Sequence, residues 1–387
     1  MIQIDNITII AASLLVILAV VTPFVNVFFR KPDIAGTAAT DVVEADTATS
    51  LPPVSIVMMA HGNPEELERN LPLYLSLDYS PGFEVIVVAW KGDLDTEDVL
   101  KRYADNPHLY TTFIPASSRY MSRKKLAVTL GVKAAKNEWI ILTEPECAPR
   151  SEKWLQIMAR NCSETVDMVV GYTAYAETTP SYRCFERLNT ELYLMRETLR
   201  GHAYRTESNN LMFRKSMFLG GDGYRGNLKY LRGEYDFMVN KYARKDNVVL
   251  ELDADGWTIE QEPTDKEWRN KHLFHIENRK HLLRSASCRV LYNIDQTLMH
   301  VNYLLILIAI SWSIPTGRWI LTGVAVAALI YTIVARTVIA GKKLRTFEIE
   351  ISPMLIVPYE ISMVWHRLGY MLKYMKADKT DFISHKI

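Results

Sequence analysis

Two acids, Glu144 and Glu146, flank Pro145 just after the short apolar run Trp139 to Leu142. Such a run predicts a buried strand. In an extended chain residues i and i+2 point to the same side, and a proline favours an extended conformation for the residue before it. The pattern therefore aims two carboxylates at one point, at the carboxyl end of a strand, where open α/β sheets bind ligands. It indicates a metal or phosphate site, with a solvated polar strand end as the alternative.

Three consecutive bases, Arg123, Lys124 and Lys125, crowd the start of a helix predicted over 122–136. Cations at a helix N-terminus oppose the helix dipole, at a cost of about 0.3–1 kcal/mol each. A bound anion would offset that cost, because helix N-termini suit phosphates. The bases therefore indicate a diphosphate site, and three solvated surface bases are the alternative.

A second pair of acids, Glu234 and Asp236, stands at the head of a helix predicted to open near Leu231. Acids at a helix start are electrostatically favoured in any case, so a simple cap is an open alternative to a catalytic role.

A basic segment over residues 262–272 surrounds one tryptophan, Trp268, with Lys266, Arg269 and Lys271. Guanidinium and ammonium groups can bind a phosphate while the indole packs against a ring. A basic face near an anionic membrane fits the same residues.

The elements that must position these residues alternate at short intervals from residue 51 onward. Strands are predicted over 54–59, 83–90, 110–114, 139–143, 167–171, 208–213 and 248–252, and helices over 65–77, 95–103, 122–136, 151–162 and 182–199. Strand–helix alternation is typical of βαβ units, so we expect the α/β class with a mostly parallel sheet.

The apolar segments lie at the two ends of the chain. Asn6 to Phe29 carries no charge and is long enough to cross a bilayer. A cleaved signal peptide is the alternative, but the run is longer than an ordinary signal core and no base precedes it. Arg30 and Lys31 follow at once, which predicts a cytoplasmic location for the next segment. Residues 298–314 and 319–340 are predicted to span as well, whereas 351–375 is broken by prolines and charges, which indicates an interfacial helix or a re-entrant segment.

These patterns divide the chain into four parts. We expect an N-terminal transmembrane anchor over 1–31, a linker over 32–50, the α/β domain over 51–285 and a C-terminal membrane region over 286–387. Lys and Arg together number 45 against 44 Asp and Glu, so a net charge of +1 gives no reason to expect nucleic acid as a partner. The four cysteines are scattered without a CxxC pair, which suits a reducing compartment.

Four motifs occur in the order and spacing of one enzyme family. They are Pro53 to Val57 with Asn63 to Glu65, the helix start at Lys124 and Lys125, Thr143 to Cys147, and Gly233 to Asp236. In these motifs the chain, over about residues 50 to 285, resembles the inverting, family 2 glycosyltransferases, including their membrane-anchored bacterial members. The resemblance implies the GT-A fold, with a Rossmann-like, mostly parallel sheet.

The resemblance also implies roles for the acids. In such enzymes a nucleotide-sugar lies over the strand ends, two acids hold a divalent cation on its diphosphate, and a later acid deprotonates the acceptor hydroxyl. By position, Glu144 and Glu146 replace the two aspartates that hold the metal, Mg²⁺ or Mn²⁺. Glu234 stands where the base is expected, and Asp236 is its neighbour and the second choice. A hard cation prefers carboxylate oxygens and neutralises a leaving diphosphate, and the acceptor needs a base within hydrogen-bond reach.

The resemblance also implies that a larger set of residues binds a UDP- or GDP-sugar. Its members are His61, Asn63, Glu65, Trp90, Asp93, Lys124, Lys125, Glu144, Trp268 and Arg269. Family members carry an acid for the nucleoside where this chain has Ala89, so Asp93 is expected to substitute or the base to stack on Trp90. The closing Gln-x-x-Arg-Trp motif is not intact, which disfavours processive polymer synthesis.

The resulting hypothesis is an enzyme, a multi-pass glycosyltransferase of the inner (cytoplasmic) membrane with its catalytic domain facing the cytoplasm. It would move a sugar from the nucleotide-sugar to a lipid-linked or saccharide acceptor, in envelope, capsule or exopolysaccharide synthesis, with membrane lipids as further partners. The alternative is a catalytically degenerate relative that binds nucleotide or scaffolds an assembly complex. A transporter is disfavoured because the spans show no buried charge pair.

Overall fold

The computed structural model describes residues 5–30, 51–115 and 122–383, which form two compact units. One unit contains residues 5–30, Pro180–Arg196 and Ala286–Gly369. The other contains the described residues between 51 and 179, Glu197–Ser285 and residues 370–383. After the roles expected from the sequence, we call them the membrane unit and the catalytic unit.

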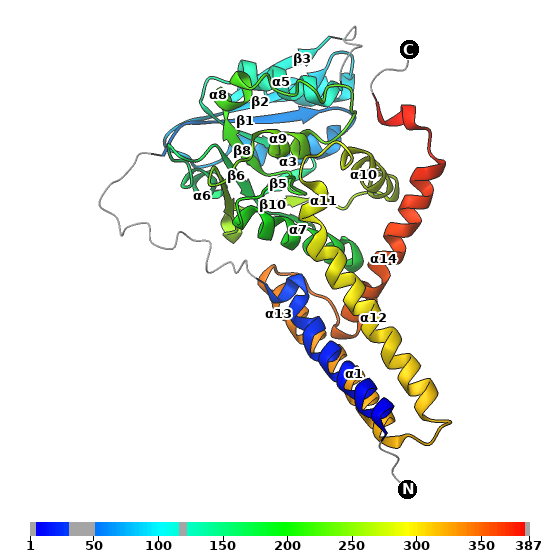
Figure 1. The fold of residues 1–387 in the computed structure, drawn as a ribbon. Helices are drawn as coiled ribbons and strands as arrows, with labels where there is room; N and C mark the ends of the chain where they lie inside the picture. Colours follow the sequence, from blue (N-terminus) through cyan, green and yellow to red (C-terminus); the bar gives the residue numbers. More distant parts are fainter. Residues whose placement is uncertain (1–4, 31–50, 116–121, 384–387) are drawn as a thin grey trace, which may run out of the picture. The chain divides into compact units, whose positions relative to one another are not determined.

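The catalytic unit is built on a seven-stranded sheet of order β3-β2-β1-β4-β8-β6-β9 (Figure 1). Its strands are β1 (Val54–Ala60), β2 (Phe83–Trp90), β3 (Leu109–Ile114), β4 (Trp139–Thr143), β6 (Met168–Gly171), β8 (Leu211–Arg214) and β9 (Val248–Glu251). β1 pairs in parallel with both β2 and β4, and β8 runs antiparallel to β4 and β6. The expected α/β class with a mostly parallel sheet is therefore confirmed.

The helices of this unit are α3 (Pro64–Leu75), α4 (Leu94–Arg102), α5 (Arg123–Ala134), α6 (Trp154–Ala159), α8 (Lys215–Gly220), α9 (Glu234–Tyr242) and α10 (Asp265–Asn278). Four of them, α3 to α6, match predicted ones and α9 begins near its predicted start, whereas α8 and α10 were not predicted. α3 buries Leu67 and Leu71 in the main core against the sheet. α5 approaches β1 so closely at Gly131 that an added Cβ would lie 2.4 Å from Cγ1 of Val57. The helix can pack there only because glycine has no side chain.

A second, three-stranded sheet has the order β5-β10-β7. Its strands are β5 (Cys147–Pro149), β7 (Thr173–Tyr175) and β10 (Thr258–Glu260). Three-residue strands carry no readable period, so the sequence did not predict them. β5 begins directly after Glu146 and therefore fixes the exit of the chain from the acid pair.

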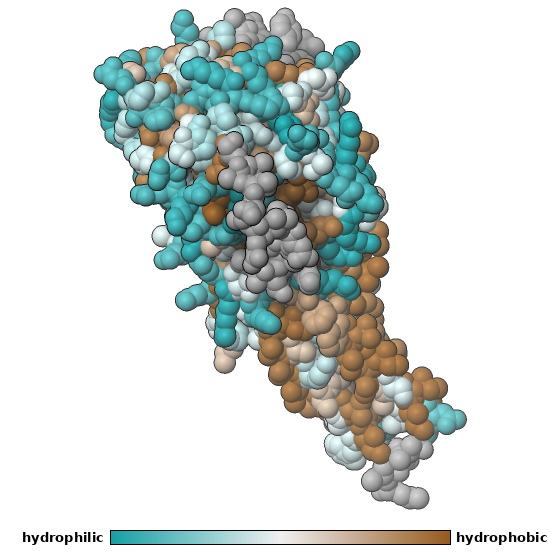
Figure 2. Space-filling model, turned by 90° about the vertical axis from the view of Figure 1, so that its left-hand side faces the viewer, coloured by the Kyte–Doolittle hydropathy of each residue, from teal (hydrophilic) through white to brown (hydrophobic). Residues whose placement is uncertain are grey.

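The membrane unit contains α1 (Asn6–Val25), η1 (Val27–Phe29), α12 (Val290–Ser313), α13 (Trp319–Thr346) and most of α14 (Pro353–Lys376). α7 (Ser181–Leu199) lies mostly in this unit, and α11 (Ser285–Cys288) precedes α12. Among the described residues three helices are long and apolar enough to cross a membrane: Asn6–Val25, Ser285–Ser313 and Trp319–Thr346. Their outward side chains are largely hydrophobic (Figure 2). The second span begins earlier than the predicted residue 298, because polar side chains interrupt its apolar pattern.

A buried charged network joins the helices of the membrane unit. Nε of Arg336 donates to Glu360 at 2.7 Å, and its Nη2 lies 3.4 Å from Asp295. Tyr193 donates to Asp295 at 3.0 Å, and the Asn26 amide donates to Glu360 at 2.6 Å. The expectation that the spans hold no buried charge pair was wrong, because the partners lie on three different helices and no local pattern reveals them.

The network predicts a large penalty for losing its cation. Arg336→Met would leave two buried carboxylates without their counter-ion and lower the free energy of unfolding by about 3–5 kcal/mol. Thermal unfolding in detergent would measure the loss. Arg318→Met is the matched control, since Arg318 pairs with Asp5, whose side chain is 42% exposed, and such a pair is worth only about 0–1 kcal/mol. Equal losses in the two variants would contradict the role of Arg336.

Candidate active site

Three loops carry polar side chains at one edge of the sheet. Since β1 is parallel to both β2 and β4, the segments that follow these strands, residues 61–63, 91–93 and 144–146, leave the sheet at the same edge. This is the edge at which parallel α/β sheets bind ligands.

The first two loops meet through His61 and Asp93. Nδ1 of His61 lies 3.2 Å from Oδ2 of Asp93, and the Gly62 amide donates to the same oxygen at 2.8 Å. The imidazole stacks on the indole of Trp90 with centroids 4.6 Å apart. Burial alone would raise the pKa of Asp93, but hydrogen bonds from Gly62, Thr96 and His61 outweigh it and lower the pKa. The loops therefore form an aromatic surface beside an ionised carboxylate.

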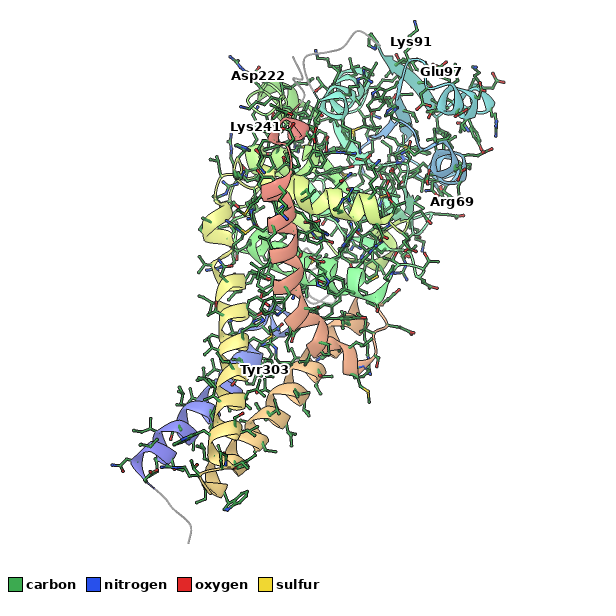
Figure 3. All side chains as sticks on the ribbon, turned by 90° about the vertical axis from the view of Figure 1, so that its right-hand side faces the viewer. Arg69, Lys91, Glu97, Asp222, Lys241 and Tyr303 are labelled. Carbon is green, nitrogen blue, oxygen red and sulfur yellow. The ribbon has the colours of Figure 1, made fainter. Side chains whose placement is uncertain are left out.

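The loop after β2 is also held from within α4. The Gly92 amide donates to Glu97 at 2.9 Å, and Figure 3 shows Glu97 near Lys91, the residue before this glycine. Gly92 has φ of +93°, a conformation that L side chains rarely adopt, so glycine is required for this turn.

The acid pair lies on a turn and not on an extended chain. The Cys147 amide donates to the Glu144 carbonyl at 3.0 Å, and the Asn70 side chain donates to the Pro145 carbonyl at 2.7 Å. The turn sends the two carboxylates to different partners, since Glu146 accepts from Asn63 at 2.9 Å whereas Glu144 does not. The extended backbone expected here is therefore wrong, whereas both acids still lie close enough to Lys124 for their charges to act on it.

Glu144 is paired with Lys124. Its Oε2 lies 3.1 Å from the ammonium, and its side chain is only 9% exposed. Burial raises the pKa of Glu144 to about 7; the attraction of Lys124 opposes this rise, and the nearby charges of Glu146 and Glu234 add to it. Burial would lower the pKa of Lys124, but its acidic neighbours, Glu144 first, outweigh burial and raise it.

Lys125 serves a different part of the structure. Its buried ammonium donates to the carbonyls of Asn227 at 3.1 Å and Arg232 at 3.2 Å, and also to that of Tyr230. Burial lowers the pKa of Lys125 to about 8, while Glu234 opposes the shift. The phosphate contact expected of Lys125 would require these bonds to break, so the structure engages it in holding the 227–232 loop.

The two acids of α9 have different surroundings. Glu234 follows Gly233, whose φ is +94°, and its carboxylate is buried with Oε1 accepting from no described residue. Asp236 lies 3.7 Å from the guanidinium of Arg205, which also binds Glu207 at 2.6 Å. Burial raises the pKa of Asp236 to about 6, against the attraction of Arg205. Of the two acids, Glu234 keeps the oxygen that is free to accept a proton.

The remaining predicted residues are spread more widely. Glu65 is exposed in the first turn of α3, and Arg269 is exposed on α10. Trp268 is buried on α10, with its ring centroid 6.4 Å from Tyr175 and 4.9 Å from His272.

Sequence reasoning missed several residues that support the site. Asn70 holds the acid turn, and Arg205 and Glu207 bind one another and surround Asp236. They stand in no motif. A buried arginine or asparagine leaves no signal in a single sequence, because only its distant partners explain its burial.

Two solved glycosyltransferase structures are similar to this chain. The mannosyltransferase PcManGT from Pyrobaculum calidifontis, solved in complex with GDP-Man and Mn²⁺, matches 94% of this chain and 98% of its own at a TM-score of 0.52 and 16% identity. S. aureus TarS 1-349, solved in complex with UDP-GlcNAc, matches 84% of this chain and 93% of its own at a TM-score of 0.43 and 12% identity. A search of curated proteins returned no match.

The fold and the acid-bearing sheet edge define the class as a glycosyltransferase of the GT-A kind. The chain belongs to glycosyl transferase family 21, whose family model matches residues 14–359. Activity as a glycosyltransferase is thereby confirmed, whereas the narrower expectation of family 2 is not.

The contacts of Lys125 predict that this residue stabilises the fold. A substitution can distinguish this role from a contact with phosphate. Lys125→Met would leave buried carbonyls unsatisfied and lower the free energy of unfolding by about 1–3 kcal/mol. Lys133→Met, at an exposed base of the same helix, would change it by no more than about 0.5 kcal/mol. Denaturant unfolding of both variants measures the difference. Unchanged stability of Lys125→Met with weakened nucleotide binding would support the phosphate contact instead.

Proposed function

We propose that this enzyme transfers a sugar, with inversion, from a UDP- or GDP-sugar to a lipid-linked or saccharide acceptor, with Glu234 as the base. The observation that carries the proposal is the buried carboxylate of Glu234, with an oxygen that accepts from no described residue. Its charge acts on Glu144, which follows β4, and on Lys124, whose ammonium is paired with Glu144. The nearness of Glu234 to these residues at the strand ends supports its role as the base.

In the proposed reaction the protein positions the donor and the acceptor and supplies charged groups. Glu234 accepts the proton of the acceptor hydroxyl, whose oxygen forms a bond to the anomeric carbon. The bond from that carbon to the diphosphate oxygen breaks from the opposite face, and its electron pair leaves on the nucleoside diphosphate. Asp236 is less suited to this role because it lies beside Arg205.

Donor recognition is proposed for the loops after β1 and β2. The exposed imidazole of His61, which stacks on the buried indole of Trp90, offers an aromatic face to a nucleobase, and Asp93 offers a carboxylate beside it. A GDP-sugar accompanies the PcManGT structure, and it is one of the two donor classes proposed for this chain.

A resident divalent cation at Glu144 and Glu146, the expected metal pair, does not fit the contacts present. The ammonium of Lys124 lies against one acid and the amide of Asn63 against the other. The described residues contain no group of three or more His, Cys, Asp and Glu side chains that could hold a metal. A Mg²⁺ or Mn²⁺ ion on a diphosphate usually takes one or two protein carboxylates and fills its other positions with water and phosphate oxygens. Here the ammonium of Lys124 already compensates the charge of Glu144, so the proposed step involves no metal.

The membrane placement extends the proposal to the acceptor. Three candidate spans are compatible with membrane association. The bases Arg30, Lys342 and Arg345 follow the ends of apolar runs, and this bias supports a multi-pass protein of the cytoplasmic membrane whose catalytic unit faces the cytoplasm. On α14 exposed apolar residues such as Trp365 and Met375 accompany lysines, which suits the lipid interface and a lipid-linked acceptor in envelope polysaccharide synthesis.

The base assignment predicts a loss of rate without a loss of fold. Glu234→Gln would slow sugar transfer by about 10²–10⁴-fold, since the amide cannot take the proton. The melting temperature and the affinity for the nucleoside diphosphate would stay near wild type. Product detection over a panel of UDP- and GDP-sugars measures the rate, and Glu164→Gln, an exposed acid of the same unit, is the control.

Two outcomes would contradict this proposal. Transfer by Glu234→Gln at the rate of the control would remove Glu234 as the base. Nucleotide binding by the wild-type protein with no transfer or hydrolysis of any donor would favour the catalytically degenerate alternative.

A further inference from the structure

We propose that the ammonium of Lys124 is the cation that neutralises the diphosphate of the donor, so that this chain binds its nucleotide without a divalent metal. The inference rests on the proposed function and names the group that meets the leaving diphosphate. It follows from the disagreement between the family's expected metal pair and the contacts of these residues.

The first observation is the location of the ammonium. Lys124 lies 3.1 Å from Glu144, at the place where a metal-binding acid would be expected to hold its cation. The charges of Glu146 and Glu234 act on it as well. The ammonium of Lys124 thus lies near three carboxylates, those of Glu144, Glu146 and Glu234, as a bound metal cation would.

The second observation is that the ammonium keeps capacity for a ligand. The Lys124 side chain is 28% exposed, whereas that of its partner Glu144 is 9% exposed. An ammonium has three donors, and among the described residues Lys124 uses one of them, in its hydrogen bond to Glu144. The remaining donors can meet phosphate oxygens while Glu144 holds the nitrogen in place. Arg232, an exposed base close enough to influence Lys124, adds a second positive charge.

The third observation is that Lys124 is held rigidly by its neighbours in the chain. Ser122 donates from Oγ to the Leu231 carbonyl at 2.8 Å, and its amide donates to the Leu228 carbonyl at 3.0 Å. Lys125 anchors the next position to the same loop. The first turn of α5, a helix of 12 residues, is thereby fixed. Its dipole adds to the positive potential felt by an anion at this end.

The fourth observation concerns the acids themselves. Glu144 and Glu146 lie on a hydrogen-bonded turn, where Glu144 accepts from Lys124 and Glu146 accepts from Asn63. The turn is held by Asn70 on one side and by the Gln261 amide, 3.0 Å from the Glu146 carbonyl, on the other. A cation held by both carboxylates would compete with these contacts from Lys124 and Asn63.

Calorimetry on the full chain in detergent tests the inference, with UDP and GDP as probes in EDTA and in Mn²⁺. Wild-type affinity is expected to be the same in both buffers. Lys124→Ala should lose about tenfold to a hundredfold in EDTA, the worth of one hydrogen bond to a charged group. Mn²⁺ should restore part of that affinity, because Glu144 and Glu146 are then free of the ammonium.

Companion variants keep the test independent of folding. Lys124→Gln can still donate to Glu144 but carries no charge, so it should lose affinity in EDTA at an unchanged melting temperature. Lys124→Arg should retain EDTA-resistant binding. Lys133→Ala, on the exposed side of the same helix, should match wild type.

The outcomes separate this inference from the proposed function. Wild-type binding that EDTA abolishes and Mn²⁺ restores, with sugar transfer intact, would overturn the inference and leave the proposed function standing. Unchanged nucleotide affinity of Lys124→Gln in EDTA would overturn it as well. A wild-type protein that binds neither UDP nor GDP in either buffer would overturn both.

Discussion

The catalytic unit depends on one buried ammonium, that of Lys125. It gathers three carbonyls of the loop over residues 227–232 at the first turn of α5. That loop leads directly into Gly233 and Glu234, so the anchor sets the position of the proposed base relative to α5. Lys124 is the preceding residue of the same turn and reaches Glu144 after β4. The two neighbouring lysines therefore bring together three segments that are far apart in sequence.

Around Lys125 the site contains more acidic than basic side chains. Glu144, Glu146 and Glu234 contribute three acids, and Lys124 and Lys125 contribute two bases, one of which is committed to carbonyls. The diphosphate of the proposed donor would bring further negative charge to this place. Because like charges in a buried site repel one another strongly, cationic groups near the strand ends would then determine whether such a donor binds. The raised pKa of Glu144, driven first by burial, reflects the same crowding.

In the membrane unit, too, one buried cation connects separate segments of the chain, and here it is the guanidinium of Arg336. The guanidinium of Arg336 binds acids from α12 and α14, and Asn26, just beyond α1, binds one of those acids too. Around it the spans pack through small and apolar side chains such as Ala19, Ala325 and Ile306. The apolar contacts pack the helices closely, and the charged network specifies which helices meet, since an unpaired charge in this environment is expensive.

Local pattern determined much of the fold. Alternating apolar strands and helices over 54–143 were placed within one or two residues of their observed bounds, since a buried run or a helical stripe is readable from neighbours in the chain. The α/β class and the apolar spans follow from the same signals. The strand ends that carry His61, Asp93 and Glu144 were predicted for that reason.

Tertiary structure alone decided what those residues do. The turn at Glu144 and Glu146 is made by hydrogen bonds from Asn70 and Cys147, and the opposite assignments of Lys124 and Lys125 depend on Glu144 and the 227–232 loop. Neighbouring lysines look alike in a sequence, because the charge and spacing of both suit a phosphate. Their difference arises from partners about 20 and 100 residues away, and only the folded chain brings these together.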